Sequence, residues 1–289
     1  MSPTLTPFAS GIAKTKATQP YHQWNTDVLA AASTSNAYVQ GDDITSFDQT
    51  ISTVKDGNRT QISRKDFIIS DTDEVSIKAG MKSQIAYQVV KRGKELRRDI
   101  EKILLNNQAA VAAASGTAPT LAGVPSWLIT NILMGAGGAA PTGDGTNTRT
   151  TGTNRNFTES LLKTALADVY TNSNDEPDML LVPPLLKQTV STFPGNATRM
   201  NQAESEKTYS AIDVYVSDFG EIRVVPDRFA DTATALILNT DLWALAWLRP
   251  IKLVDLAKTG DAEKRMIVCE YTLEARNELG NGAVYDVTP

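Results

Sequence analysis

The feature that most constrains the fold is an amphipathic segment at residues 73–114, which carries the clearest helical pattern in the chain. Asp71 and Glu74 at its start have the spacing of a capping box. The pattern predicts one helix over about residues 73–112. Some 30–35 helical residues would span roughly 45–50 Å and would form the spine of a flat or elongated domain. Large apolar residues recur at intervals of four or seven, with one interruption near Gly93: Met81, Ile85, Val89, Leu96, Ile100 and Leu104.

The opposite face of this segment is charged between Lys91 and Lys102, where bases alternate with acids. This alternation predicts an exposed, salt-bridged surface rather than a nucleic-acid groove. The formal net charge of −5 argues against a protein whose whole surface binds nucleic acid, although it leaves room for a local basic patch.

Residues 40–72 have the pattern of two strands that form an extended hairpin. A β-rich run at 50–54 precedes Lys55-Asp56-Gly57-Asn58, and Asp-Gly is a strong hairpin turn signal. The return strand is expected from Thr60 to Ser70. Because an isolated hairpin is marginal in water and this one has few apolar residues, we expect it to pack mostly on a neighbouring subunit.

Residues 1–39 have the composition of an extended arm, because prolines interrupt it at 3, 7 and 20. Phe8, Ile12, Tyr21 and Trp24 lie along it, so the arm is expected to cover a surface of its own chain or of a neighbour. We expect assembly, rather than the free subunit, to order it. The alternative is a loosely packed N-terminal segment of the same domain.

The remainder of the chain alternates between helices and strands. We expect a short helix at 125–133, a flexible glycine-rich loop at 135–147, and a helix from Phe157 through Val169. A buried strand at 178–182, a helix to Phe193, a hairpin of 212–216 with 222–225, and strands at 235–238 and 242–248 follow. A long hairpin from Ile251 to Ala275 and a short last strand complete an α+β pattern.

The sequence offers little for catalysis. One histidine, His22, and one cysteine, Cys269, exclude two-imidazole sites, an internal disulfide and a thiolate metal cage. His22 is interpreted as a packing or hydrogen-bonding residue and Cys269 as a buried inert thiol. The glycine tract lacks the Lys-Ser/Thr pair of a P-loop. Acid clusters at 42–43 and 71–74 are typical of turns and helix starts, so we assign no catalytic, cofactor-binding or metal-binding residue.

Several stretches together resemble the major capsid proteins of tailed bacteriophages with the Hong Kong 97 fold. The resemblance covers nearly the whole chain, and the stretch at 255–265 is its most specific part. The stretches are Ser2–Phe8, Tyr21–Asp27, Gly41–Asp43, Gln61–Arg64, Arg92–Asp99, Asp213–Gly220, Leu248–Pro250, Asp255–Arg265 and Glu270–Leu273.

The resemblance implies an N-terminal arm at 1–39, an extended E-loop at 40–72 and a P-domain at 73–156 built on the spine helix. It also implies an A-domain at 157–250 with a small central sheet, and return strands of the P-domain at 251–289. Subunits of this family form pentamers and hexamers of an icosahedral shell around packaged double-stranded DNA.

The implied partners are other copies of the chain, a portal protein at one vertex, separate scaffolding and decoration proteins, and DNA on the inner face without sequence specificity. We expect no cofactor, no membrane, and no covalent cross-link through Lys55 or Lys65. Assembly is expected in the host bacterial cytoplasm, since neither an apolar run of membrane length nor a signal peptide is present. The residues expected to contact neighbouring subunits are Phe8, Tyr21, Trp24, Phe47, Lys55, Arg59, Arg64, Lys65, Lys258, Asp261 and Arg265.

Two alternatives remain at this point. An encapsulin-like nanocompartment shell would share the fold but enclose cargo enzymes. A cytosolic hydrolase or nucleotide-binding enzyme is disfavoured by the single histidine and by the glycine tract.

Overall fold

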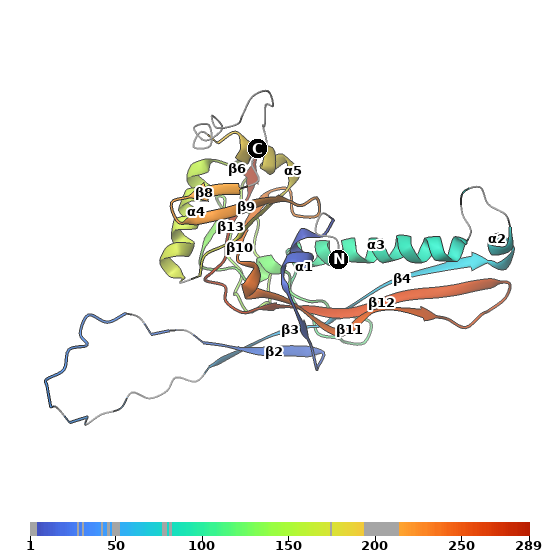
Figure 1. Ribbon diagram of the computed structural model, residues 1–289, viewed down its shortest axis with the longest axis horizontal. Coiled ribbons are helices and arrows are strands. Elements are labelled where there is room, and N and C mark those ends of the chain that lie inside the picture. The colour runs from blue at the N-terminus through green and yellow to red at the C-terminus, as the bar shows by residue number, and fades with distance from the viewer. Residues whose placement is uncertain are drawn as a thin grey trace.

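The computed structural model describes residues 5–27, 29–30, 32–41, 43–44, 47, 53–76, 80, 83–173, 175–193 and 214–289. Two projections leave a central body in opposite directions (Figure 1). One contains the long helix α3 (Gln84–Leu105) and the strands beneath it. The other is the antiparallel pair of β2 (Tyr21–Thr26) and β3 (Val54–Arg59). The chain mixes helices and strands, as its sequence predicted.

The body contains a six-stranded sheet with a hydrophobic core on each face. Helices α4 (Glu159–Asn172) and α5 (Pro184–Ser191) cover one face. Because side chains alternate along a strand, Leu180 packs with these helices and Leu181 packs in the second core. The predicted helices and strands of residues 157–238 are confirmed within a few residues; Ile212 lies outside the described part. The strand order is β5 (Ile132–Leu133), β13 (Gly282–Tyr285), β10 (Thr234–Leu238), β7 (Met179–Val182), β9 (Gly220–Pro226) and β8 (Val214–Ser217).

A four-stranded sheet runs from the body into the α3 projection. Its order is β1 (Ala13–Lys16), β11 (Trp243–Asp255), β12 (Ala262–Ala275) and β4 (Gln61–Ser70). The predicted break between 248 and 251 is wrong, because β11 continues through Pro250. The pairing of β1 with β11 ends at Trp247 and the register with β12 shifts between Trp247 and Lys252. Pro250 therefore sits at an irregular edge, where a proline is tolerated in a strand.

The predicted spine helix is shorter than expected. A five-residue helix α2 (Asp71–Val75) is separate from α3, which has 22 residues. The carboxylate of Glu74 accepts hydrogen bonds from the backbone N–H groups of Gln84 (2.9 Å) and Ile85 (3.1 Å). Glu74 thus caps the start of α3 from outside and does not form a capping box with Asp71. The predicted apolar face is confirmed at Leu96, Ile100 and Leu104, which are fully buried.

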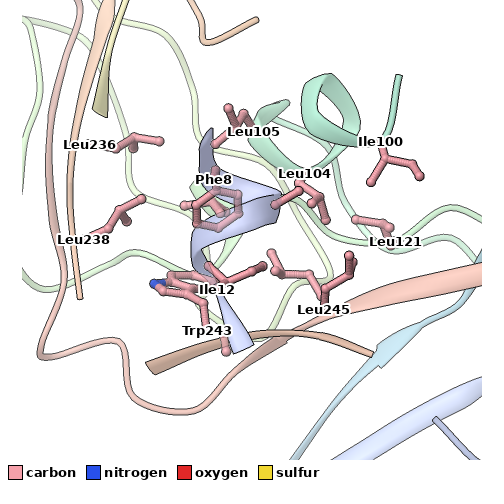
Figure 2. Packing of buried hydrophobic residues seen from close by; sticks show 14 of the residues in the cluster. Phe8, Ile12, Ile100, Leu104, Leu105, Leu121, Leu236, Leu238, Trp243 and Leu245 are labelled. Carbon is pink, nitrogen blue, oxygen red and sulfur yellow. The ribbon is translucent and has the colours of Figure 1, made fainter. Parts of the chain in front are cut away.

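The N-terminal segment belongs to the subunit's own core, so the expectation that only assembly orders it is wrong for residues 7–26. Helix α1 (Pro7–Gly11) inserts Phe8 between α3 and the six-stranded sheet, next to Leu104 and Leu236 (Figure 2). The Phe8 ring meets the Trp243 ring edge-on at 6.2 Å between centroids. Strand β1 then joins β11 in parallel. The alternative reading, a segment packed within the same domain, is the correct one here.

The predicted Asp56-Gly57 turn is also wrong. Gly57 lies within β3 opposite Gln23 of β2, and its φ is not positive. A Cβ atom at Gly57 would come within 2.7 Å of the Tyr21 ring. The glycine therefore makes room for an aromatic ring instead of supplying a turn. The extended hairpin consists of β2 and β3, and residues 27–53 connect them.

Two smaller expectations change as well. Residues 125–133 hold a short 3₁₀ turn (Val124–Ser126) and strand β5 instead of a helix. The glycine tract is packed: at Gly145, with φ 73°, a Cβ would lie 2.8 Å from the Trp127 ring. The last strand, β13, is confirmed but joins the six-stranded sheet, and β14 (Val287–Thr288) pairs with β6 (Arg155–Asn156). Among the described helices, none has the length and apolarity needed to cross a bilayer.

Candidate assembly surface

The root of the β2–β3 hairpin is fixed to the body by buried polar contacts. Asn58 is fully buried, and its amide group donates to the carbonyl oxygens of Ala122 (3.2 Å) and Leu273 (2.9 Å). Its side-chain oxygen accepts from the Ala122 N–H at 2.9 Å. Because a buried amide is costly unless it is hydrogen-bonded, this set of contacts specifies where β3 crosses the body.

His22 and Trp24 attach the other strand of the hairpin. The His22 Nε2 atom lies 3.2 Å from a carboxylate oxygen of Glu274, and the Trp24 ring lies 5.5 Å from the Trp127 ring. Burial would raise the pKa of Glu274, but hydrogen bonds from Arg276, His22 and Thr15 outweigh it and lower this pKa. The interpretation of His22 as a hydrogen-bonding residue is confirmed.

Beyond this root the hairpin exposes large apolar side chains. Within the described residues of the connection, five of them are between 76% and 85% exposed: Leu29, Tyr38, Val39, Ile44 and Phe47. Val54 at the start of β3 is also exposed. Soluble monomers rarely expose so many large apolar groups together. We call these six residues the apolar hairpin surface; it can bind another protein but has no chemistry of its own.

The residues expected at subunit contacts fall into separate places. Phe47 lies in the apolar hairpin surface, and Lys55 is exposed on β3. Tyr21 is partly exposed, with the Arg59 guanidinium 5.0 Å from its ring centre. Trp24 is half-buried at the root. Phe8 is fully buried in its own chain and has no surface to offer a neighbour, so its expected role at a contact is corrected to a core residue.

The remaining expected contacts lie on the α3 projection. Arg64 is exposed on β4, and Lys65 forms an ion pair with Asp99 of α3 at 2.6 Å. Asp261 is exposed at the β11–β12 connection, where Lys258 pairs with Asp71. Arg265 bridges Asp255 (3.1 Å) and Glu263 (3.2 Å). These side chains lie on the projection opposite to the one that carries the apolar hairpin surface (Figure 1), and Arg64 and Lys65, as neighbours in β4, point to opposite faces of the sheet.

A buried acid pair escaped the sequence analysis. Glu101 of α3 accepts hydrogen bonds from the backbone N–H groups of Phe8 (2.7 Å) and Ala9 (2.8 Å). Its side chain also contacts Asp227, which is 1% exposed and has one carboxylate oxygen without another partner. Burial, together with the negative charge of Asp227, raises the pKa of Glu101 to about 8. A proton shared between the two carboxyl groups satisfies both. No sequence pattern indicated this pair, because Glu101 stands within a run of charged residues that is typical of an exposed helix face.

Apart from the Glu101–Asp227 pair, the described residues contain no cluster of side chains that could serve catalysis or hold a metal ion. Cys269 is buried, as predicted, and burial raises its pKa to about 12. No group of three or more His, Cys, Asp or Glu side chains in the described part could hold a metal ion. Of the acid clusters noted in the sequence, Glu74 caps α3 and Asp71 pairs with Lys258, while Asp42 lies outside the described residues.

The comparisons with known proteins agree on one family. A family model described as SU10 major capsid protein matches residues 1–288. The major capsid protein of Escherichia phage Phieco32 is 27% identical over 321 residues, which cover 99% of this chain and 91% of that protein.

Solved structures share the fold at low identity. A chain of the cyanophage A-1(L) capsid asymmetric unit has a TM-score of 0.68 and 14% identity over 99% of this chain and 94% of that chain. The holo-SrpI encapsulin from Synechococcus elongatus PCC 7942 has a TM-score of 0.57 and 10% identity over 99% and 90%. At these identities the structures show the fold, which is of the Hong Kong 97 type; phage capsids and an encapsulin both have it.

The family model decides between the two, because it spans almost the entire chain and describes capsid proteins. The family model and the curated relative both describe major capsid proteins, and neither describes an encapsulin or an enzyme. The chain belongs to the SU10 major capsid protein family and is the major capsid protein of a tailed phage.

Proposed function

We propose that this subunit assembles into pentamers and hexamers of an icosahedral shell, and that the apolar hairpin surface holds neighbouring subunits together. The supporting observation is a projection whose root is fixed by buried hydrogen bonds and whose far end exposes large apolar side chains. At roughly 25 cal/mol per Å² of apolar surface removed from water, covering these side chains would favour association strongly.

In this proposal the hairpin of β2 and β3 with its connecting residues 27–53 acts as the E-loop. The α3 projection acts as the P-domain, and the six-stranded sheet with α4 and α5 acts as the A-domain. The shell would enclose double-stranded DNA without sequence specificity and be assembled in the host cytoplasm. It would carry a portal protein at one vertex and use separate scaffolding and decoration proteins. The subunit would have no enzymatic role.

The proposal includes the absence of a covalent cross-link between subunits. A cross-linking lysine needs a desolvated amine near a carboxylate base. Lys55 is exposed on β3, and Lys65 is engaged by Asp99 in its own chain. A denaturing gel of mature particles should therefore give one subunit band, and a ladder of multimers would contradict this part of the proposal.

The assembly role is tested by a variant with Tyr38→Ser, Ile44→Ser and Phe47→Ser. These side chains are exposed in the subunit, so thermal unfolding of the free subunit should not change. Stable shells, measured by sedimentation and electron microscopy, should be lost. Leu185→Ser, which removes an exposed apolar residue of α5, is the matched control and should assemble normally. Shells of normal yield and stability from the triple variant would overturn the proposal.

A further inference from the structure

Helix α3 presents a line of exposed cations along one side. Lys91, Lys94, Arg98 and Lys102 are all exposed, and they follow one another at intervals of three, four and four residues. At about 100° per residue they fall within a sector of roughly 80°. We call these four residues the basic stripe; along the helix axis it is about 16 Å long.

The acids of α3 have partners outside this stripe, although the charge of Lys91 also acts on Glu95. Glu95 accepts a hydrogen bond from Arg92 at 2.8 Å, and this contact lowers the pKa of Glu95. Asp99 pairs with Lys65 of β4 at 2.6 Å. Glu101 points inward, toward the N–H groups of α1. The expected salt-bridged face is therefore confirmed at Arg92–Glu95 and at Asp99–Lys65, whereas the cations of the stripe form no such ion pair.

Within the described part of the chain no cation of the stripe makes an ion-pair contact with a carboxylate, and Lys91 alone has a longer-range interaction with Glu95. None of the ion pairs found there involves Lys91, Lys94 or Lys102, and Arg98 instead lies 5.3 Å from the Phe229 ring centre. This positive line is local, since the chain as a whole carries a net charge of −5. Uncompensated charges of one sign on a rigid helix indicate a surface that attracts a polyanion.

The geometry points to the kind of polyanion. The stripe consists of long cationic side chains on the exposed side of a helix, so it fits a row of regularly spaced charges. Duplex DNA presents phosphates along each strand at about 3.4 Å of axial spacing, a distance that flexible Lys and Arg side chains can follow. An acidic protein segment would be expected to use apolar contacts as well; the exposed Tyr87 lies one turn before Lys91 on the same side of α3, so an acidic peptide is included in the test.

We propose that the basic stripe of α3 contacts the phosphate backbone of double-stranded DNA without reading its sequence. The inference rests on the proposed function, in which the shell encloses DNA, and it places this side of α3 toward the interior. Contacts of this kind release condensed counterions, so affinity should fall steeply with salt and should be equal for unrelated sequences.

The test uses full-length subunits kept below the concentration at which shells form. Binding of two unrelated labelled 20-base-pair duplexes is measured by fluorescence anisotropy between 50 and 200 mM salt. The variant is Lys94→Ala, Arg98→Ala and Lys102→Ala. Alanine has the highest helix propensity of the residues, so these substitutions at exposed positions should keep α3 intact. Thermal unfolding should confirm that the variant is folded. Removing three phosphate contacts should reduce the slope of log affinity against log salt by about 2.7.

The matched control is Lys163→Ala, Arg223→Ala and Lys252→Ala, which removes three exposed cations from other elements. It should retain the wild-type slope. An equal loss of slope in both variants, or in neither, would overturn the assignment of the stripe. If a polyglutamate peptide binds the wild type more tightly than either duplex and the stripe variant loses only that binding, the partner is an acidic protein, and the DNA proposal is wrong.

Shell formation by the same variants, observed by electron microscopy, separates the two proposals. Normal shells from a stripe variant whose DNA binding is unchanged would refute the stripe and leave the assembly role intact. Failure of the wild-type subunit to form any shell would instead refute the proposed function.

Discussion

Replacing Glu101 with glutamine is expected to remove a loss of stability that the wild-type subunit undergoes as the pH rises. In the folded chain, burial and the adjacent Asp227 carboxyl raise the pKa of Glu101 from 4.5 to about 8. Burial also raises the pKa of Asp227 and outweighs the hydrogen bonds with the Phe229 N–H and Glu101 and the charge of Arg228, all of which lower it. The folded subunit therefore keeps a proton that the unfolded chain has already released.

The sign of the effect follows from this difference. Between pH 4.5 and about 8 the unfolded chain binds fewer protons at Glu101, so the free energy of unfolding falls as the pH rises. The stabilisation is complete below pH 4.5 and is lost as the pH rises through about 8. Each pKa unit is worth about 1.36 kcal/mol, so the whole interval corresponds to roughly 5 kcal/mol. Asp227 acts in the same direction.

Glutamine cannot ionise, so Glu101→Gln should lose the part of this pH dependence that Glu101 contributes, and only the smaller contribution of the buried Asp227 should remain. The amide has one oxygen for the two N–H donors of Phe8 and Ala9, and the unpaired donor should cost about 1–3 kcal/mol. The variant should therefore be less stable than the wild type at pH 5 and equally or more stable at pH 8.5.

The measurement is urea unfolding of unassembled subunits at pH 5, 6.5 and 8.5, followed by tryptophan fluorescence. Asp99→Asn is the matched control, because it removes a half-exposed carboxylate from the same helix and should keep the wild-type pH dependence. If Glu101→Gln loses as much stability as the wild type between pH 5 and 8.5, the buried acid pair is not the cause.

Three further perturbations probe the core and the hairpin. Phe8→Ala should cost about 3–5 kcal/mol of subunit stability, measured by urea unfolding, because Phe8 is fully buried; a cost below 1 kcal/mol would return α1 to the status of a loose arm. Gly57→Ala should destabilise the β2–β3 pair by about 1–3 kcal/mol, and adding Tyr21→Ala should recover part of that loss, since the added methyl group meets the Tyr21 ring. Cys269 should react with a thiol reagent in the native subunit many times more slowly than in urea, because it is buried and its pKa is raised to about 12; equal rates would place it at the surface.

Local patterns predicted the parts of the fold in which neighbours in sequence determine the structure. Helix α4, strand β7 and the β8–β9 hairpin follow from periodicity and turn residues. The errors arose where residues distant in sequence determine the local structure. Asp56-Gly57 is a turn signal by itself, but pairing with β2 and the Tyr21 ring place it within a strand.

The candidate sites show the same division. The charged run of α3 could be recognised from the sequence, but not its separation into paired acids and a free line of cations, because Lys65 and the N–H groups of α1 come from other elements. The apolar hairpin surface was only partly predicted, through Phe47. Leu29 and Tyr38 were visible as large apolar residues, yet their exposure depends on where the root of the hairpin is fixed.

The contacts of that root have a consequence for the order of folding during translation. Phe8 packs on Trp243, Thr15 hydrogen-bonds to Glu274, and Asn58 donates to the carbonyl of Leu273. The segments around Phe8, Thr15 and Asn58 therefore cannot reach their final place until the ribosome has released residue 275. Contacts so distant in sequence form late. Chains cut short in synthesis would lack a fixed hairpin, so nascent and truncated chains would be kept out of a growing shell.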